Sequence, residues 1–119
     1  MTNARLAGKR ILIAEDDWFI AKGLARDLQR AGADVPGPVS TVGEALDRVR
    51  DEPLDGAVLD INLRGEMAYA VIDLLAERNV PFVLATGYSP DAVPVRYRDV
   101  PCCTKPVEIG ALARALFPA

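Results

Sequence analysis

Four short motifs hold the side chains of this sequence that are best suited to chemistry, and they recur at nearly even spacing. They are Glu15-Asp16-Asp17, Asp60, Ala85-Thr86-Gly87 and Lys105-Pro106. Each of the first three closes or follows an apolar run with strand character, and Lys105 ends a fourth such run. Strand ends on one edge of a parallel α/β sheet converge, so residues far apart in sequence can meet in one cleft. The spacing therefore predicts a site for Mg²⁺ and a phosphoryl group.

The residue types suggest a division of labour within such a site. Glu15, Asp16 and Asp60 would repel one another, and a hard divalent cation with oxygen ligands would relieve that repulsion. The Asp60 carboxylate could accept a phosphoryl group as a nucleophile and form an acyl phosphate. Lys105 could neutralise one phosphoryl oxygen, and Thr86 could donate a hydrogen bond to another.

Each of these residues also has a structural explanation when it is taken alone. Asp17 is well placed to cap the helix that follows it, and a lone Thr86 could satisfy a loop backbone group. A lone Lys105 could be a surface charge. The prediction therefore rests on the joint pattern, because several coincidences at matching strand ends are improbable.

Composition sets the broad class of the protein. Its 119 residues are 50% hydrophobic with a mean hydropathy of +0.12, which favours a compact domain with one core. A net charge of −3 argues against direct binding to nucleic acid or an anionic membrane. No apolar run reaches the roughly 18 residues that span a bilayer, and residues 1–10 lack the apolar core of a secretion signal. We expect one cytoplasmic domain over residues 1–119, without an output domain.

Two further features of the composition narrow the chemistry. The chain contains no histidine, which excludes imidazole catalysis and means that any phosphohistidine donor is a second molecule. Cys102 and Cys103 are adjacent, so their side chains should point to opposite faces of a strand and cannot form a disulfide. We expect both to be small buried hydrophobes in a reducing compartment.

Apolar runs alternate with segments of helical spacing along the whole chain. Strands are predicted over 10–14, 34–39, 56–61, 82–85 and 100–104, with helices between them and a final helix over 107–117. Two prolines make 34–39 an edge strand, and Pro90 and Pro94 make any helix in the fourth unit short or distorted. The pattern predicts an α/β fold, a flavodoxin-like (βα)5 doubly wound parallel sheet of strand order 2-1-3-4-5.

Together these motifs resemble the receiver domain of bacterial two-component response regulators over essentially the whole chain. The resemblance implies that Asp60 is the phosphoacceptor and that Asp16 binds Mg²⁺, with Glu15 supporting it through water. It implies that the main-chain carbonyl of Asn62 is a further ligand. Thr86 and Lys105 would read the phosphoryl group, and Lys105-Pro106 would be a cis peptide.

The sequence departs from many receivers at the position three residues before the lysine, where Cys102 replaces an aromatic side chain. Ala85-Thr86-Gly87-Tyr88 and the proline-broken segment after it resemble an alphaproteobacterial subgroup that lacks this aromatic and has a reduced fourth helix. An aromatic switch is therefore not expected here.

The leading hypothesis is a receiver that takes a phosphoryl group from a histidine kinase or a histidine phosphotransfer protein. It would catalyse its own phosphorylation at Asp60 and its own dephosphorylation rather than turn over a substrate. Its signal would pass to a protein partner through Tyr88 to Asp99 and the last strand and helix. One alternative is an adaptor with this fold that works without phosphorylation. Another is an aspartate-nucleophile phosphatase of the haloacid dehalogenase type, but Asn62 stands where such enzymes have a second acid.

Overall fold

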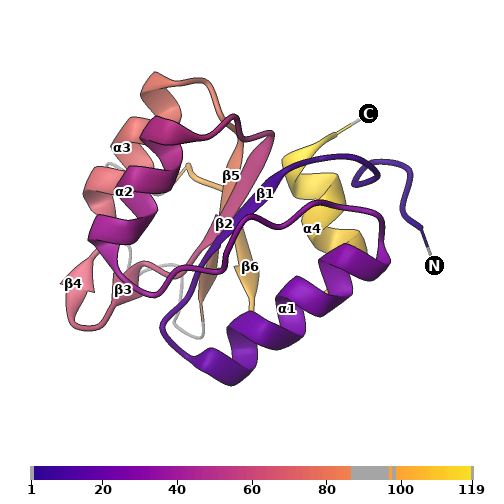
Figure 1. Ribbon diagram of the computed structural model, residues 1–119, viewed down its shortest axis with the longest axis horizontal. Coiled ribbons are helices and arrows are strands. Elements are labelled where there is room, and N and C mark those ends of the chain that lie inside the picture. Colours follow the sequence, from indigo (N-terminus) through magenta and orange to yellow (C-terminus); the bar gives the residue numbers. More distant parts are fainter. Residues whose placement is uncertain (1, 87–96, 98, 119) are drawn as a thin grey trace.

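The computed structural model describes residues 2–86, 97 and 99–118, which form a parallel sheet between two layers of helices (Figure 1). The strands of this sheet lie in the order β1-β2-β5-β6, and every neighbouring pair is parallel. They are β1 (Ile11–Ala14), β2 (Gly56–Leu59), β5 (Phe82–Thr86) and β6 (Cys102–Thr104). The described helices are α1 (Trp18–Arg30), α2 (Val42–Asp51), α3 (Tyr69–Glu77) and α4 (Ile109–Leu116).

The central strands supply side chains to a separate core on each face of the sheet. Leu12 and Leu59 belong to the core under α2 and α3, whereas Ile13 and Val58 belong to the core under α1 and α4. Successive residues of a strand point to opposite faces, so a continuous apolar run is required where both faces are covered. Figure 1 shows the two helix pairs on opposite sides of the sheet. The α/β class and the doubly wound arrangement are thus confirmed.

The predicted second strand lies at the expected edge, but it is not a continuous strand. Residues 34–39 make two isolated parallel bridges with β1, one at each end, pairing Arg10 with Asp34 and Ala14 with Val39. Between the bridges, Pro36 and Pro38 have no N–H group to donate to a ladder. With this segment beside β1, the order 2-1-3-4-5 is confirmed, whereas the prediction of a regular edge strand is wrong.

The first two helices begin after capping side chains, of which the Asp17 cap is predicted from the sequence. The Asp17 carboxylate accepts hydrogen bonds from the backbone N–H groups of Phe19 and Ile20, at 3.0 and 3.2 Å. Thr41 Oγ1 likewise accepts one from the Glu44 N–H at 3.1 Å. The helical spacing of Ile20, Leu24 and Leu28 predicts that all three face the core; Leu24 and Leu28 are buried, but Ile20 lies at the margin of the buried stripe of α1 and is 39% exposed.

A hairpin that the sequence did not predict follows β2. It consists of β3 (Asn62–Leu63) and β4 (Glu66–Met67), paired antiparallel across a turn at Arg64 and Gly65, which the glycine alone marks in the sequence. Its second strand ends two residues before α3 begins, so it links the end of β2 directly to the helix layer.

The two cysteines are less buried than expected. Both thiols are free, as predicted, but Cys102 is exposed and Cys103 is half-buried. The prediction of two buried residues is wrong because β6 is the outermost strand of the described sheet and has a neighbour on one side, β5. Cys103 still packs against the core under α1 and α4.

The predicted fourth unit and most of the predicted Tyr88 to Asp99 partner surface fall on residues 87–96 and 98, outside the described residues. Tyr97 is described, and it is buried against α3. Its ring stacks on Tyr69 with centroids 5.0 Å apart, and its hydroxyl donates to Asp73 Oδ1 at 3.1 Å. Within the described residues, none of the helices has the length and apolar character that crossing a bilayer requires.

A core substitution tests how firmly the fold supports the end of β2. Leu59 is fully buried in the core under α2 and α3, directly before Asp60. We expect Leu59→Ala to lower the free energy of unfolding by about 2–5 kcal/mol, measured by urea denaturation, because it leaves a cavity. The half-buried Leu46 on α2 offers a matched control, Leu46→Ala, which should lose clearly less. Equal losses would contradict this placement of Leu59.

Candidate functional site

The predicted site residues stand at the ends of four neighbouring strands. Glu15 follows β1, Asp60 follows β2, Thr86 ends β5 and Lys105 follows β6. Because these strands are parallel and adjacent, all four residues lie at the carboxyl edge of the sheet. The sequence-based expectation that they converge is confirmed.

The Lys105 ammonium group lies between two carboxylates. Its Nζ is 2.7 Å from Glu15 Oε1 and 2.8 Å from Asp60 Oδ2, and all three side chains are less than one-fifth exposed. Such charge-assisted contacts are short and strong when both partners are shielded from water. One cation therefore ties the end of β6 to the ends of β1 and β2.

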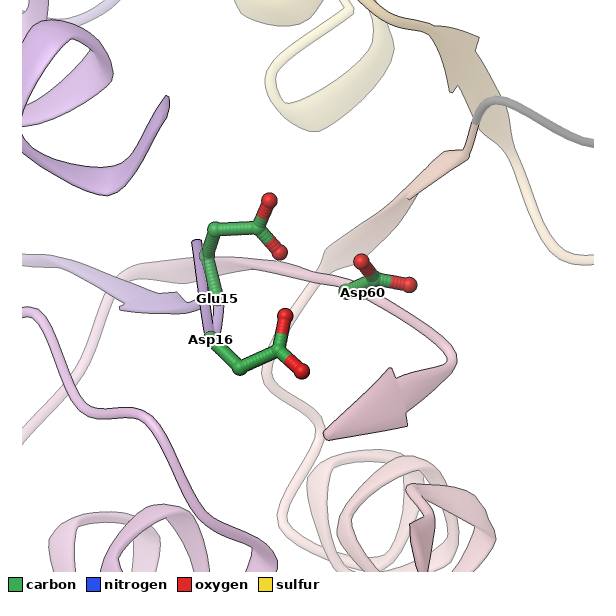
Figure 2. Close-up of side chains that lie close together, drawn as sticks. All are labelled: Glu15, Asp16 and Asp60. Carbon is green, nitrogen blue, oxygen red and sulfur yellow. The ribbon is translucent and has the colours of Figure 1, made fainter. Parts of the chain in front are cut away.

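Asp16 completes a group of three carboxylates that face a common space. Ligand oxygens of Glu15, Asp16 and Asp60 all lie within 4.8 Å of one another, and Figure 2 shows the three side chains close together. Asp16 is exposed, and its Oδ2 accepts a hydrogen bond from the backbone N–H of Arg64 at 2.9 Å. The turn of the β3–β4 hairpin is thus hydrogen-bonded to one of the three carboxylates.

The electrostatics of the group are dominated by Glu15. Burial raises the pKa of its carboxyl from 4.5 to about 7; Asp60 adds to the rise, and Lys105 opposes it. The pKa of Lys105 is raised despite its burial, because Asp60 and Glu15 both stabilise the ammonium form. Glu15 is only 5% exposed, and its second oxygen, Oε2, is buried without a hydrogen-bond partner among the described residues.

This donor set fits a hard divalent cation. Three carboxylates against one ammonium group leave an excess of negative charge, and oxygen is the donor that Mg²⁺ and Ca²⁺ prefer. Nearly all buried polar atoms have a partner, which is a protein group, an ordered water or an ion. Glu15 Oε2 is a buried oxygen of this group that has no partner among the described residues.

The other predicted residues adjoin the carboxylates through the backbone. The Lys105 N–H donates to the Thr86 carbonyl at 3.1 Å, and Thr86 is buried. The Asn62 N–H donates to Asp60 Oδ1 at 3.2 Å. The Lys105-Pro106 peptide is cis, as the resemblance implied.

Sequence reasoning missed an apolar surface beside this site. Trp18 and Phe19 at the start of α1 are 62% and 81% exposed. Together with Ile20 they form an apolar run that lies outside the buried stripe of the helix. A groove of about 460 Å³ runs from Phe19 and Ile20 to Lys105 and Val107. The consecutive Trp-Phe-Ile after the capping aspartate was the available signal.

Comparisons with known proteins place this arrangement in a family. No protein-family model matches the chain. Among solved structures, it resembles SdrG from Sphingomonas melonis Fr1, with 43% identity over 96% of each chain and a TM-score of 0.80. The receiver domain of the response regulator PhyR from Erythrobacter litoralis matches with 26% identity over 92% of this chain and 87% of that one, with a TM-score of 0.77.

Among curated proteins, the chain is 28% identical over 112 residues to the transcriptional regulatory protein PdtaR of Mycobacterium tuberculosis. The match covers 91% of this chain but 55% of the relative, so the chain spans about half the length of the curated relatives it matches. The near full-length likeness to SdrG, the receiver fold and the convergent acids and lysine agree with one another. The chain belongs to the receiver domains of response regulators.

Proposed function

We propose that this receiver accepts a phosphoryl group on Asp60 in a Mg²⁺-dependent reaction and signals by binding other proteins. The observation that carries the proposal is the Asp60 carboxylate, held 2.8 Å from Lys105 Nζ beside the unpaired Glu15 oxygen. A nucleophile, a neutralising cation and a carboxylate set for a metal ion are the parts that phosphoryl transfer needs.

In the proposed reaction, a carboxylate oxygen of Asp60 attacks the phosphorus of a phosphohistidine on a second protein. An O–P bond forms as the P–N bond to the donor imidazole breaks, and the imidazole leaves with the electron pair and takes up a proton. Lys105 faces one phosphoryl oxygen, and Thr86, at the adjacent strand end, donates to another. Lys105 and Thr86 would also bind the product, the acyl phosphate on Asp60.

Glu15, Asp16 and Asp60 would hold the Mg²⁺, together with the main-chain carbonyl of Asn62. When bound, the ion supplies positive charge that neutralises the transferring phosphoryl group. The proposal is supported by two relatives. One structure of SdrG, at 44% identity, is described as its BeF3-activated conformation. A structure from Burkholderia pseudomallei with the same fold is described as containing a phosphorylated aspartic acid and a calcium ion.

We propose that the donor is a histidine kinase or a histidine phosphotransfer protein and that it docks on the apolar groove beside α1. A donor that brings its imidazole to Asp60 must cover the residues around Lys105, and Lys105 forms one wall of that groove. Phe19 and Ile20 on the opposite wall offer apolar area that a helix of the donor could bury. The downstream partner would use Tyr88 to Asp99, β6 and α4, and the protein would act in the cytoplasm.

The phosphoacceptor assignment has a direct test. We expect Asp60→Asn to abolish Mg²⁺-dependent labelling by a phosphohistidine donor, because the amide is a poor nucleophile, as measured with radiolabelled ATP and a competent kinase. Asp47→Asn on the exposed face of α2 is the matched control and should be labelled like the wild type. Full labelling of Asp60→Asn would refute the assignment, and steady hydrolysis of small phosphate esters by the wild type would favour a phosphatase instead.

The raised pKa of Glu15 predicts how metal-free stability depends on pH. The folded carboxyl binds its proton more tightly than the unfolded one, so the free energy of unfolding should fall as the pH rises from 4.5 to about 7. The loss attributable to Glu15 is at most about 3 kcal/mol. Urea denaturation in a chelator should show a shallower decline for Glu15→Gln than for the wild type.

The exposed Glu77 at the end of α3 supplies the control, since Glu77→Gln should keep the wild-type pH profile. At pH 8, Mg²⁺ should stabilise the wild type and Glu77→Gln more than Glu15→Gln. An identical pH profile and Mg²⁺ response in all three proteins would show that the Glu15 carboxyl does not have a raised pKa and does not take part in Mg²⁺ binding.

Phe19 tests the donor surface. Because Phe19 is 81% exposed, Phe19→Ala should leave the free energy of unfolding within about 0.5 kcal/mol of the wild type. We expect phosphotransfer from a protein donor to slow roughly tenfold or more through a higher KM, as an aromatic anchor is lost. Phosphorylation by acetyl phosphate should stay unchanged. Docking at this groove would be contradicted if Phe19→Ala slowed phosphorylation by the protein donor and by acetyl phosphate equally. It would also be contradicted if the variant slowed neither reaction.

A further inference from the structure

The β3–β4 hairpin contains a tight turn with unusual backbone angles. Leu63 pairs with Glu66, so the turn consists of Arg64 and Gly65 alone. Both turn residues have left-handed backbone angles, φ 53° for Arg64 and φ 86° for Gly65. Positive φ at both central positions defines the two-residue turn that matches the twist of antiparallel strands. Glycine reaches this region without strain, whereas most other residues do not.

The Asn62 side chain braces this turn. Its Oδ1 accepts a hydrogen bond from the Gly65 N–H at 2.9 Å, and its Nδ2 lies 3.7 Å from the sulfur of Met67 on the opposite strand. The amide group of Asn62 is therefore engaged within the hairpin. Meanwhile its backbone N–H donates to Asp60 Oδ1, so the base of the hairpin is attached to the carboxylate group.

The tip of the hairpin reaches the same group from the other side. The Arg64 N–H donates to Asp16 Oδ2 at 2.9 Å, joining residues 48 positions apart in sequence. Asp16 is exposed, so burial does not restrict the rotation of its side chain as it does for Glu15. A hydrogen bond from a fixed backbone group does restrict it, and it leaves the second oxygen of Asp16 free to bind an ion.

We propose that the β3–β4 hairpin positions Asp16 for cation binding, with Asn62 and Gly65 as positioning residues that act through the Arg64 N–H. This inference rests on the proposed Mg²⁺ site. A ligand that is already held in the binding geometry loses less conformational freedom when the ion binds, so affinity rises without any added contact. The role of Asn62 then includes shaping the turn with its side chain.

Gly65 provides a matched pair of variants. A Cβ atom at Gly65 meets nothing within 4 Å, so a new side chain has room and any effect comes from the backbone. Valine is strongly disfavoured at φ 86°, whereas asparagine tolerates the left-handed region. We expect Gly65→Val to weaken binding of Mg²⁺ about fivefold or more, because a turn that leaves the left-handed region no longer holds the Arg64 N–H against Asp16. Gly65→Asn should stay within about twofold of the wild type.

Affinity is measured by titrating MgCl2 into each protein and following the fluorescence of Trp18, the single tryptophan, which lies two residues from Asp16. Amide exchange of Arg64 gives a readout that needs no metal, and it should be faster in Gly65→Val than in Gly65→Asn. Asn62→Ala removes the acceptor of the Gly65 N–H while keeping Gly65 itself and the main-chain carbonyl at position 62. It should weaken Mg²⁺ binding by a factor between those expected for Gly65→Asn and Gly65→Val. This variant keeps the inference testable if Gly65→Val does not fold.

Equal Mg²⁺ affinities for the wild type, Gly65→Val and Asn62→Ala would overturn the inference, even if all three were still phosphorylated on Asp60. In that case the proposed function would stand and the hairpin would be only structural. A wild-type protein that binds no Mg²⁺ and takes no phosphoryl group would overturn the proposed function and this inference together. The two failures are therefore distinguishable.

Discussion

The contact of one ammonium group with two carboxylates, one buried and one partly buried, organises the functional edge of this protein. Lys105 Nζ lies within 2.8 Å of both Glu15 and Asp60, and those three residues follow three different strands of one sheet. Without the lysine, two carboxylates would be shielded from water and uncompensated, which is among the most costly arrangements in a protein. With it, the Glu15 carboxyl still has a raised pKa and a buried oxygen for which the described part of the chain supplies no partner. The group is therefore held together but left short of positive charge, a state that favours cation binding.

The sheet makes that group rigid. β1 and β2 are buried on both faces, so the residues that immediately follow them inherit the positions of strands packed into two cores. The edge segment contributes as well, because the Glu15 N–H donates to the Val39 carbonyl at 2.9 Å. Pro36 and Pro38 interrupt this segment without loosening Glu15, since the bridge at Val39 lies beyond them. Precise placement of reacting groups on rigid elements is what phosphoryl transfer by positioning and charge requires.

Much of the fold and of the candidate site could be predicted because the strongest sequence signals were short apolar runs, each of which is visible in a few neighbouring residues. Each apolar run that ends at an acid or a lysine marks both a buried strand and its functional end, so the sequence alone places Glu15, Asp60 and Lys105 at one edge of the sheet. The β3–β4 hairpin could not be predicted, because two-residue strands are too short to show alternation and the sequence marks only the turn at Arg64 and Gly65. The exposure of Cys102 depends on β6 being the outer strand of the described sheet, and the exposure of Ile20 depends on which face of α1 packs against the sheet. Both are properties of packing rather than of residue type.

The absence of an aromatic residue at Cys102 leaves the question of how a change at Asp60 reaches the surface, and the described contacts offer a route that does not need one. Asp60 is bonded to the start of the hairpin through Asn62, and the hairpin ends two residues before α3 begins. The first residue of α3, Tyr69, stacks on Tyr97, whose hydroxyl also binds Asp73 one turn further along the same helix. A phosphoryl group on Asp60 would compete for Lys105 and for the Asn62 N–H, so the first backbone it would disturb is that of the hairpin. Because packed elements shift as units rather than deform gradually, a movement of the hairpin would pass to α3 and then to Tyr97. In this receiver Tyr97 is thus linked to the site through the hairpin and α3 rather than through a side chain of β6.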